Sequence, residues 1–195
     1  MKKAIVILLA LMIATVAFAA DLPKDPDTVD YVMDNPSLIV IAGELTDASP
    51  TFHRWRPASY EDLGLNCDLV MTSDYTTEPH FDQFCFNVST SDPVEFVVTD
   101  AGFDTVIYIY CDPFDANDAT LNGVFMDDDD GGGLNSAIVA TDGVTLTPGD
   151  DYWFIICSYS STVGTYSVST SDNVGLCGTV ANEASTWSNV KGLFN

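Results

Sequence analysis

Positive charge is scarce in this sequence of 195 residues. Lys and Arg together number 6 against 29 Asp and Glu, so the formal net charge at pH 7 is −23. Proteins that bind nucleic acid or anionic lipid need clustered basic side chains, and this composition argues against both kinds of partner. His is also rare, with 2 residues, and neither belongs to an H-E-x-x-H pair that would hold a catalytic zinc.

The local signatures of common enzymes are missing as well. The sequence has no G-x-S-x-G nucleophile elbow and no C-x-x-C pair for zinc or redox chemistry. Carboxylates abundant enough for a glycoside hydrolase are present, but the Glu residues are scattered among different segments. We therefore expect a protein that is not an enzyme, with a small secreted hydrolase as an alternative.

Long apolar runs are absent apart from one at the N-terminus. Lys2 and Lys3 precede an apolar run over residues 4–17, and Ala17-Phe18-Ala19 has the A-x-A form of a signal cleavage site. We interpret residues 1–19 as a secretory signal removed after Ala19, which leaves no membrane-spanning segment. The mature protein is then expected to be extracellular or periplasmic, or associated with the cell surface.

The cysteine count is small and odd. In an exported protein, disulfides are the default, so at least one thiol of the five is free or pairs between chains. Spacing does not choose among the alternative pairings. The five cysteines are Cys67, Cys85, Cys111, Cys157 and Cys177.

What the sequence does contain is a series of short strand-like segments. They are rich in β-branched and aromatic residues, and Gly, Pro, Asp and Ser separate them. Such spacing predicts an all-β antiparallel sandwich of about eight strands, jelly-roll-like in type. The predicted strands are 37–43, 81–89, 94–99, 105–110, 124–126, 137–140, 152–158 and 165–170.

The flanking segments differ in composition from this domain, which we place at 37–172. Residues 20–36 are rich in Asp and Pro and predict an acidic, loose lead-in. Residues 173–195 form a C-terminal tail, in which a short helix would align Trp187, Val190 and Phe194 on one face. We expect that apolar face, with Leu193, to be buried against the sandwich or a partner.

Acidic side chains are most concentrated in one loop, where four Asp residues precede residues 131–133, all Gly. Adjacent carboxylates repel one another, so a folded loop needs either a cation or full exposure to solvent. Calcium prefers carboxylate and carbonyl oxygens, but the EF-hand pattern fails because position 12 counted from Asp128 is Val139. The alternative is a solvated hairpin tip without metal.

A second acidic segment follows the predicted strand 105–110. If this strand and 124–126 are neighbours, the two acidic loops could share one end of the sandwich and bind one calcium. The predicted ligands are Asp112, Asp115, Asn117, Asp127, Asp128, Asp129, Asp130 and Asn135.

The longest connection, about 46–80, carries two arginines within His53-Arg54-Trp55-Arg56. Two interpretations stay open: the arginines pair with nearby carboxylates, or they form a receptor for an anion or a carboxylate. The tryptophans offer a similar choice between a flat sugar-binding face and packing in the core, and core packing is the usual role of aromatic residues in strands.

Three segments in order resemble the bacterial pre-peptidase C-terminal domain family. They are FDQFCFNV at 81–88, FDTVIYIY at 103–110 continuing to DDDGGGLNSAI at 128–138, and LTPGDDYWFI at 146–155 followed by GTYSV at 164–168. The resemblance implies an exported, non-catalytic jelly-roll-like sandwich that accompanies secreted enzymes, and some members bind calcium. No catalytic domain accompanies it in this sequence.

Together these features predict a secreted, calcium-stabilised module that binds an unknown extracellular protein or glycan. The alternative is a structural component of the cell exterior, polymerising through the unpaired cysteine or the termini.

Overall fold

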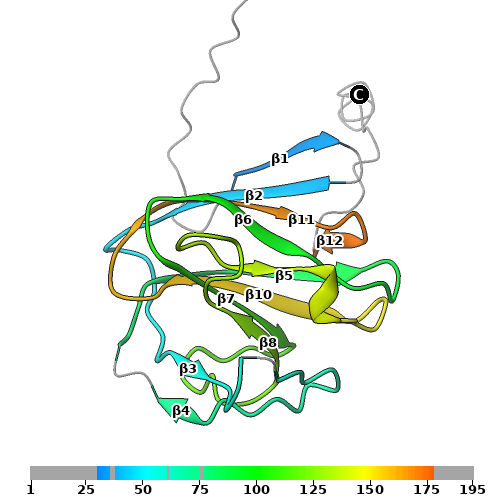
Figure 1. Ribbon diagram of the computed structural model, residues 1–195, viewed down its shortest axis with the longest axis horizontal. Helices are drawn as coiled ribbons and strands as arrows, with labels where there is room; N and C mark the ends of the chain where they lie inside the picture. Colours follow the sequence, from blue (N-terminus) through cyan, green and yellow to red (C-terminus); the bar gives the residue numbers. More distant parts are fainter. Residues whose placement is uncertain (1–29, 36–37, 61, 75–76, 178–195) are drawn as a thin grey trace, which may run out of the picture.

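The computed structural model describes residues 30–35, 38–60, 62–74 and 77–177, and these form strands, loops and one short 3₁₀ helix (Figure 1). The strands make two five-stranded antiparallel sheets and one two-stranded ribbon. The elements are β1 Asp30–Asn35, β2 Leu38–Leu45, β3 Trp55–Arg56, β4 Ser73–Asp74, β5 Phe81–Val88, β6 Phe96–Ala101, β7 Thr105–Cys111, β8 Gly123–Asp127, β9 Ala137–Ile138, η1 Ala140–Asp142, β10 Asp151–Ser158, β11 Gly164–Thr170 and β12 Val174–Leu176.

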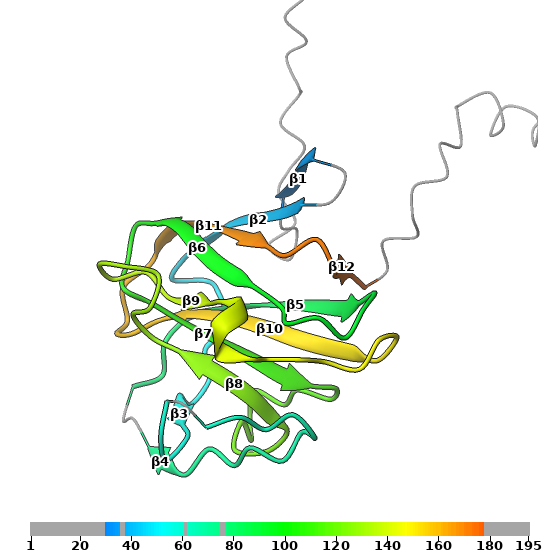
Figure 2. The same ribbon diagram turned by 45° about the vertical axis from the view of Figure 1, so that its right-hand side comes forward.

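The topology is that of a jelly roll. One sheet has the order β1-β2-β11-β6-β9 and the other β12-β5-β10-β7-β8, and they lie face to face (Figure 2). Without the edge strands β1 and β12, each sheet has four strands. If these eight strands are numbered 1 to 8 along the chain, from β2 to β11, the first sheet has the order 1-8-3-6 and the second 2-7-4-5. In this arrangement two Greek keys wrap around each other. The predicted all-β sandwich is confirmed, and each of the eight predicted segments overlaps one of these strands.

Four strands, three of them of only two or three residues, fall where none was predicted. The segment expected to be a loose lead-in contains β1, which pairs antiparallel with β2 and places Asn35 opposite Leu38. The predicted tail contains β12, which pairs with β5, and the long connection contains β3 and β4. Strands of two or three residues are too short to show alternation, and backbone pairing overrides the low strand propensity of Asp in β1. The predicted signal at 1–19 and the predicted helix near Trp187 lie outside the described residues.

The main core fills the space between the two sheets. From β5 it receives Phe84, Phe86 and Val88, the face expected from the alternation of that strand. Across the sandwich, the rings of Phe96 and Phe154 stack with their centroids 4.4 Å apart. Burial of each such side chain contributes about 1.5–3 kcal/mol to the free energy of folding, so this core is the principal source of stability.

A second core lies on the outer face of the sheet that contains β7. All seven residues of β7 are buried, because the connection over residues 46–80 covers the face turned away from the first sheet. We call the described residues within 46–80 the loop layer; β3 and β4 lie in it, on the far side of β7 and β8 from the other sheet in both views (Figures 1 and 2). The loop layer contributes Phe52, Leu69 and Met71 to this second core. A segment predicted from the sequence to be a long connection therefore forms a third layer on the sandwich.

The loop layer and the adjacent turns also satisfy polar groups of the buried strand. The hydroxyl of Tyr108 donates a hydrogen bond of 3.0 Å to the carbonyl of Trp55, and the hydroxyl of Tyr110 donates one of 3.1 Å to the carbonyl of Ala119. Trp55 and Trp153 pack against the second core. Both side chains are half-buried, so they pack on the second core and also contribute to the surface.

Two disulfides cross-link the sandwich: Cys67–Cys111 and Cys85–Cys177. The fifth cysteine, Cys157, is unpaired and has no exposed surface in β10. Burial raises the pKa of its thiol strongly, so it is not placed to cross-link chains. Two disulfides are typical of proteins of oxidising compartments. Within the described residues, no helix has the length and apolarity to span a bilayer.

Candidate metal centre

Three carboxylates converge at the end of the sandwich where β7 begins and β8 ends. Asp104 stands directly before β7, and Asp128 and Asp129 follow β8. One oxygen from each lies within 4.8 Å of the others. We call Asp104, Asp128 and Asp129 the acidic cluster. Two segments that are separate in the sequence build it, because β7 and β8 pair antiparallel, with Ile107 opposite Asp127.

Hydrogen bonds fix the loop that carries Asp128 and Asp129. The carboxylate of Asp127 is turned into the loop, where Oδ2 accepts the backbone N–H of Ala137 at 2.7 Å. The hydroxyl of Ser136 lies 2.6 Å from the Asp128 carbonyl and 2.7 Å from the Thr105 carbonyl, and the N–H of Ser136 donates to Thr105 Oγ1 at 2.8 Å. The loop is therefore anchored on the first residue of β7, beside Asp104.

The glycine run is required for this path. A Cβ on Gly131 would lie 2.6 Å from the carbonyl oxygen of Asn135 and 2.7 Å from that of Ser136, both backbone atoms that cannot move aside. Gly132 and Gly133 have φ of +90° and +73°, in the region that side chains disfavour. The three glycines thus allow the chain to return tightly after Asp130.

The carboxylates of the loop are held in an unfavourable electrostatic environment. Burial, followed by the charge of Asp129, raises the pKa of Asp128 to about 6. Burial also raises the pKa of Asp127 to about 6, against the effect of the N–H bond from Ala137. The pKa of Asp104 is raised by burial and by the charge of Asp129. A cation at this end would stabilise the ionised forms.

The protein places one cation of its own beside the cluster. Arg54, from the loop layer, is 1% exposed, and its guanidinium carbon lies 4.4 Å from the centre of the Tyr159 ring. Its charge lowers the pKa of both Asp104 and Asp128, opposing the effect of burial. For Arg54, this agrees with the interpretation in which the arginines pair with nearby carboxylates. With Arg54, the ionised acidic cluster keeps a net charge of −2, which follows from three carboxylates and one guanidinium.

The acidic cluster meets the geometric requirement of a calcium site. Ligands of one calcium lie 2.3–2.6 Å from the ion, so two of them are at most about 5 Å apart. Oδ1 of Asp104 and Oδ1 of Asp128 are buried, and neither accepts a hydrogen bond from the described part of the chain. Buried oxygens without donors are costly unless a proton or a metal occupies them. The three carboxylates supply three to six ligand oxygens, and water would supply the rest.

The predicted ligands of the second acidic segment are not at this site. β7 and β8 are consecutive antiparallel strands, so the connection between them lies at the opposite end from the loop after β8. Asp112 accepts a hydrogen bond from the indole N–H of Trp153 at 2.9 Å. Asp115 caps a turn by accepting from the backbone and side chain of Asn117 at 2.8 and 3.0 Å. The prediction that both loops share one end of the sandwich is therefore wrong.

Within the loop after β8, the predicted ligands have different roles. Asp128 and Asp129 belong to the acidic cluster, Asp127 closes the loop, and Asp130 is exposed. Asn135 acts through its backbone, where its carbonyl accepts the N–H of Gly131 at 2.8 Å. Sequence reasoning missed Asp104, although this carboxylate directly precedes the strand that neighbours the loop.

No protein-family model matches this chain, and no curated protein matches it either.

Proposed function

We propose that the protein is an exported, non-catalytic jelly-roll module that acts in extracellular or cell-surface interactions and binds calcium at the acidic cluster. The observation that carries the calcium site is the convergence of Asp104, Asp128 and Asp129 around two buried oxygens without hydrogen-bond donors. The export of the chain is supported by the N-terminal sequence and by the two disulfides. The resemblance to the pre-peptidase C-terminal domain family supports the non-catalytic role.

Calcium fits this site better than magnesium. The cluster offers carboxylates at irregular positions on a loop and at a strand start, which suits the flexible coordination of calcium. Magnesium demands a strict octahedron and keeps its waters. Arg54 limits the charge of the cluster to −2, so one divalent ion neutralises these four groups.

Calorimetric titration and thermal unfolding of the disulfide-bonded protein in calcium test the site. A ligand that binds only the folded state stabilises it by about 2.7 kcal/mol at a hundredfold excess over the dissociation constant. For a protein of this size that shift corresponds to a rise in Tm of about 5–10 °C. Asp128→Asn combined with Asp129→Asn is expected to abolish both the heat of binding and the rise in Tm.

The matched control is Asp112→Asn combined with Asp115→Asn. It removes the same number of charges at the opposite end of the β7–β8 pair, and it should leave the calcium response intact. Sodium at equal ionic strength controls for general screening of a chain with net charge −23. Equal shifts in sodium and calcium, or equal loss in both double variants, would refute the calcium site.

The partner that we propose is an extracellular protein or a glycan. Retention on immobilised glycans and on cell-surface extracts should be measured in calcium and in chelator. Retention that requires calcium and is lost in Asp128→Asn with Asp129→Asn would make the metal part of the binding surface. Retention that is unchanged by the chelator would limit the metal to a stabilising role. Failure of the protein to bind either the glycans or the extracts would refute the interaction role.

A further inference from the structure

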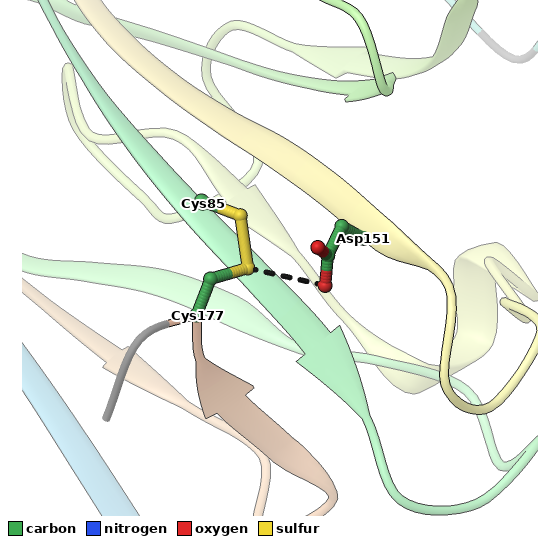
Figure 3. Close-up of side chains that lie close together, drawn as sticks. All are labelled: Cys85, Asp151 and Cys177. Atoms are coloured by element: carbon green, nitrogen blue, oxygen red, sulfur yellow. Dashed lines mark hydrogen bonds between the residues drawn. A yellow bond between two sulfur atoms is a disulfide. The ribbon is translucent and has the colours of Figure 1, made fainter. Parts of the chain in front are cut away.

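The two disulfides occupy very different positions in the fold. Cys67–Cys111 ends in β7, the strand buried on both faces, and Cys111 is 5% exposed. Cys85–Cys177 joins β5 to the residue after β12 (Figure 3). Both of its cysteines are partly exposed. An attacking thiolate at Cys67 would have to expel the Cys111 thiolate into the core, which disfavours the exchange. No such penalty protects Cys85–Cys177.

β12 is held on the sheet by a short pairing, by two apolar side chains and by this disulfide. β12 is an edge strand of three residues, and it pairs with β5 at Val174–Val88, Gly175–Asn87 and Leu176–Phe86. Val174 is buried in the main core at 5% exposure, and the half-buried Leu176 packs against the same core. The backbone N–H of Cys177 adds one hydrogen bond of 2.9 Å to the carbonyl of Cys85.

The strand also lies outside the eight-stranded jelly roll. β12 is not one of the eight jelly-roll strands; it lies next to β5 at the edge of its sheet. Loss of β12 would leave β5 paired with β10 over seven residue pairs, from Phe81 to Asn87. The disulfide therefore secures an appendage and does not close the sandwich.

A carboxylate stands beside the exposed disulfide. Asp151, the first residue of β10, places Oδ1 3.4 Å from Cys177 Sγ (Figure 3). A disulfide sulfur has no proton to donate, so this contact becomes a hydrogen bond only when Cys177 is a thiol. The negative charge repels an approaching thiolate and disfavours a thiolate on Cys177. Asp151 is thus placed to slow both reduction and re-formation of the bond.

We propose that Cys85–Cys177 is a thiol–disulfide exchange site through which a dithiol releases β12 while the jelly roll stays folded. A thiolate of the dithiol attacks one sulfur, the Cys85–Cys177 bond breaks, and a mixed disulfide forms. The second thiol of the reductant then displaces the remaining cysteine. Two electrons pass to the cysteine pair, the two thiol protons of the dithiol end on Cys85 and Cys177, and the reductant leaves as its cyclic disulfide. Release opens the edge of β5 at Phe86–Val88, an unpaired edge that can accept another strand.

Titration of the native protein with dithiothreitol tests this site independently of calcium. Alkylation and peptide mapping should show Cys85 and Cys177 modified at reductant concentrations that leave Cys67–Cys111 intact. Hydrogen exchange at the amides of β12 should then accelerate, while β7 and β10 stay protected. Reduction of both disulfides together, or selective reduction with β12 still protected, would overturn the proposal.

Two variants sharpen the test. Asp151→Asn should accelerate reduction about fivefold at low salt, the effect of one unit charge about 4 Å from the reacting sulfur in water. Asp150→Asn, the neighbouring exposed carboxylate, serves as the control and should change the rate much less. A combined Cys85→Ser and Cys177→Ser variant should fold with β12 exposed to exchange from the outset. If β12 keeps its protection in that variant, the disulfide is not its latch.

Discussion

Arg54 provides the most stringent test of how the acidic end of the sandwich is stabilised. Its guanidinium is 1% exposed, lies 4.4 Å from the Tyr159 ring centre, and lowers the pKa of Asp104 and Asp128. Arg54→Met keeps much of the apolar stem and removes the charge. The half-buried carboxylates then lose their counter-charge, and removal of one partner from a buried pair costs about 3–5 kcal/mol.

The lower part of this range is expected, because the two carboxylates are partly exposed to solvent. A loss of about 3 kcal/mol corresponds to a fall in Tm of about 6–12 °C for a protein of this size. Urea denaturation in chelator, followed by Trp fluorescence, measures the loss directly as a shift of the midpoint at constant slope. Calcium should restore part of the stability of Arg54→Met, because the ion and the guanidinium relieve the same repulsion.

The matched control is Arg56→Met, two residues along the same segment. Arg56 is partly exposed, and its guanidinium carbon lies 5.9 Å from the centre of the Tyr60 ring, so its loss should cost less than about 1 kcal/mol. Adding Asp128→Asn to Arg54→Met should recover some of the loss, since neutralising the acid removes the unpaired charge. Equal destabilisation by both arginine variants, or no recovery in the double variant, would refute the role given to Arg54.

Three further outcomes follow from the same contacts. In chelator, stability should rise as the pH falls from 7 to 5, because Asp127 and Asp128, with pKa raised to about 6, bind protons more tightly when folded; a urea midpoint that is unchanged or lower at pH 5 would contradict this. Tyr166→Phe removes a buried hydroxyl that donates to a carboxylate at 2.6 Å and should cost about 1.5–3 kcal/mol in denaturant titration. Cys67→Ser with Cys111→Ser removes a disulfide between residues 44 positions apart and should lower the free energy of unfolding by about 4 kcal/mol. A loss below about 1 kcal/mol would show that the loop layer folds against β7 without the disulfide.

Most of the sandwich could be predicted because its strands carry their own pattern. Phe84, Phe86 and Val88 alternate with polar residues, and their burial in the main core follows directly from a period of two. Thr105–Cys111 shows no polar alternation, which is what a strand buried on both faces requires. The sequence did not reveal the layer that covers its second face.

That layer is invisible to local pattern because its contacts are long-range. Phe52 and Met71 lie in a segment with almost no strand structure, and they enter the second core only because the segment folds over β7. Arg54 reaches the acidic cluster by the same route, across 50 residues of sequence from Asp104. Neither spacing nor composition near Arg54 indicates which carboxylates it meets. The choice between paired arginine and anion receptor needed the tertiary structure.

The composition of the acidic cluster, in contrast, was within reach of topological reasoning. In an antiparallel pair of consecutive strands, the connecting loop lies at one end, and the segments before the first strand and after the second lie together at the other. Applied to strands 105–110 and 124–126, this rule separates Asp112 and Asp115 from the loop after 126 and joins that loop to Asp104. The structure has this arrangement, with Ile107 opposite Asp127. The pairing of the two strands was expected to bring the loop after 110 and the loop after 126 together. In an antiparallel pair it places these loops at opposite ends. The carboxylate that lies beside the loop after 126 is Asp104, before the first strand.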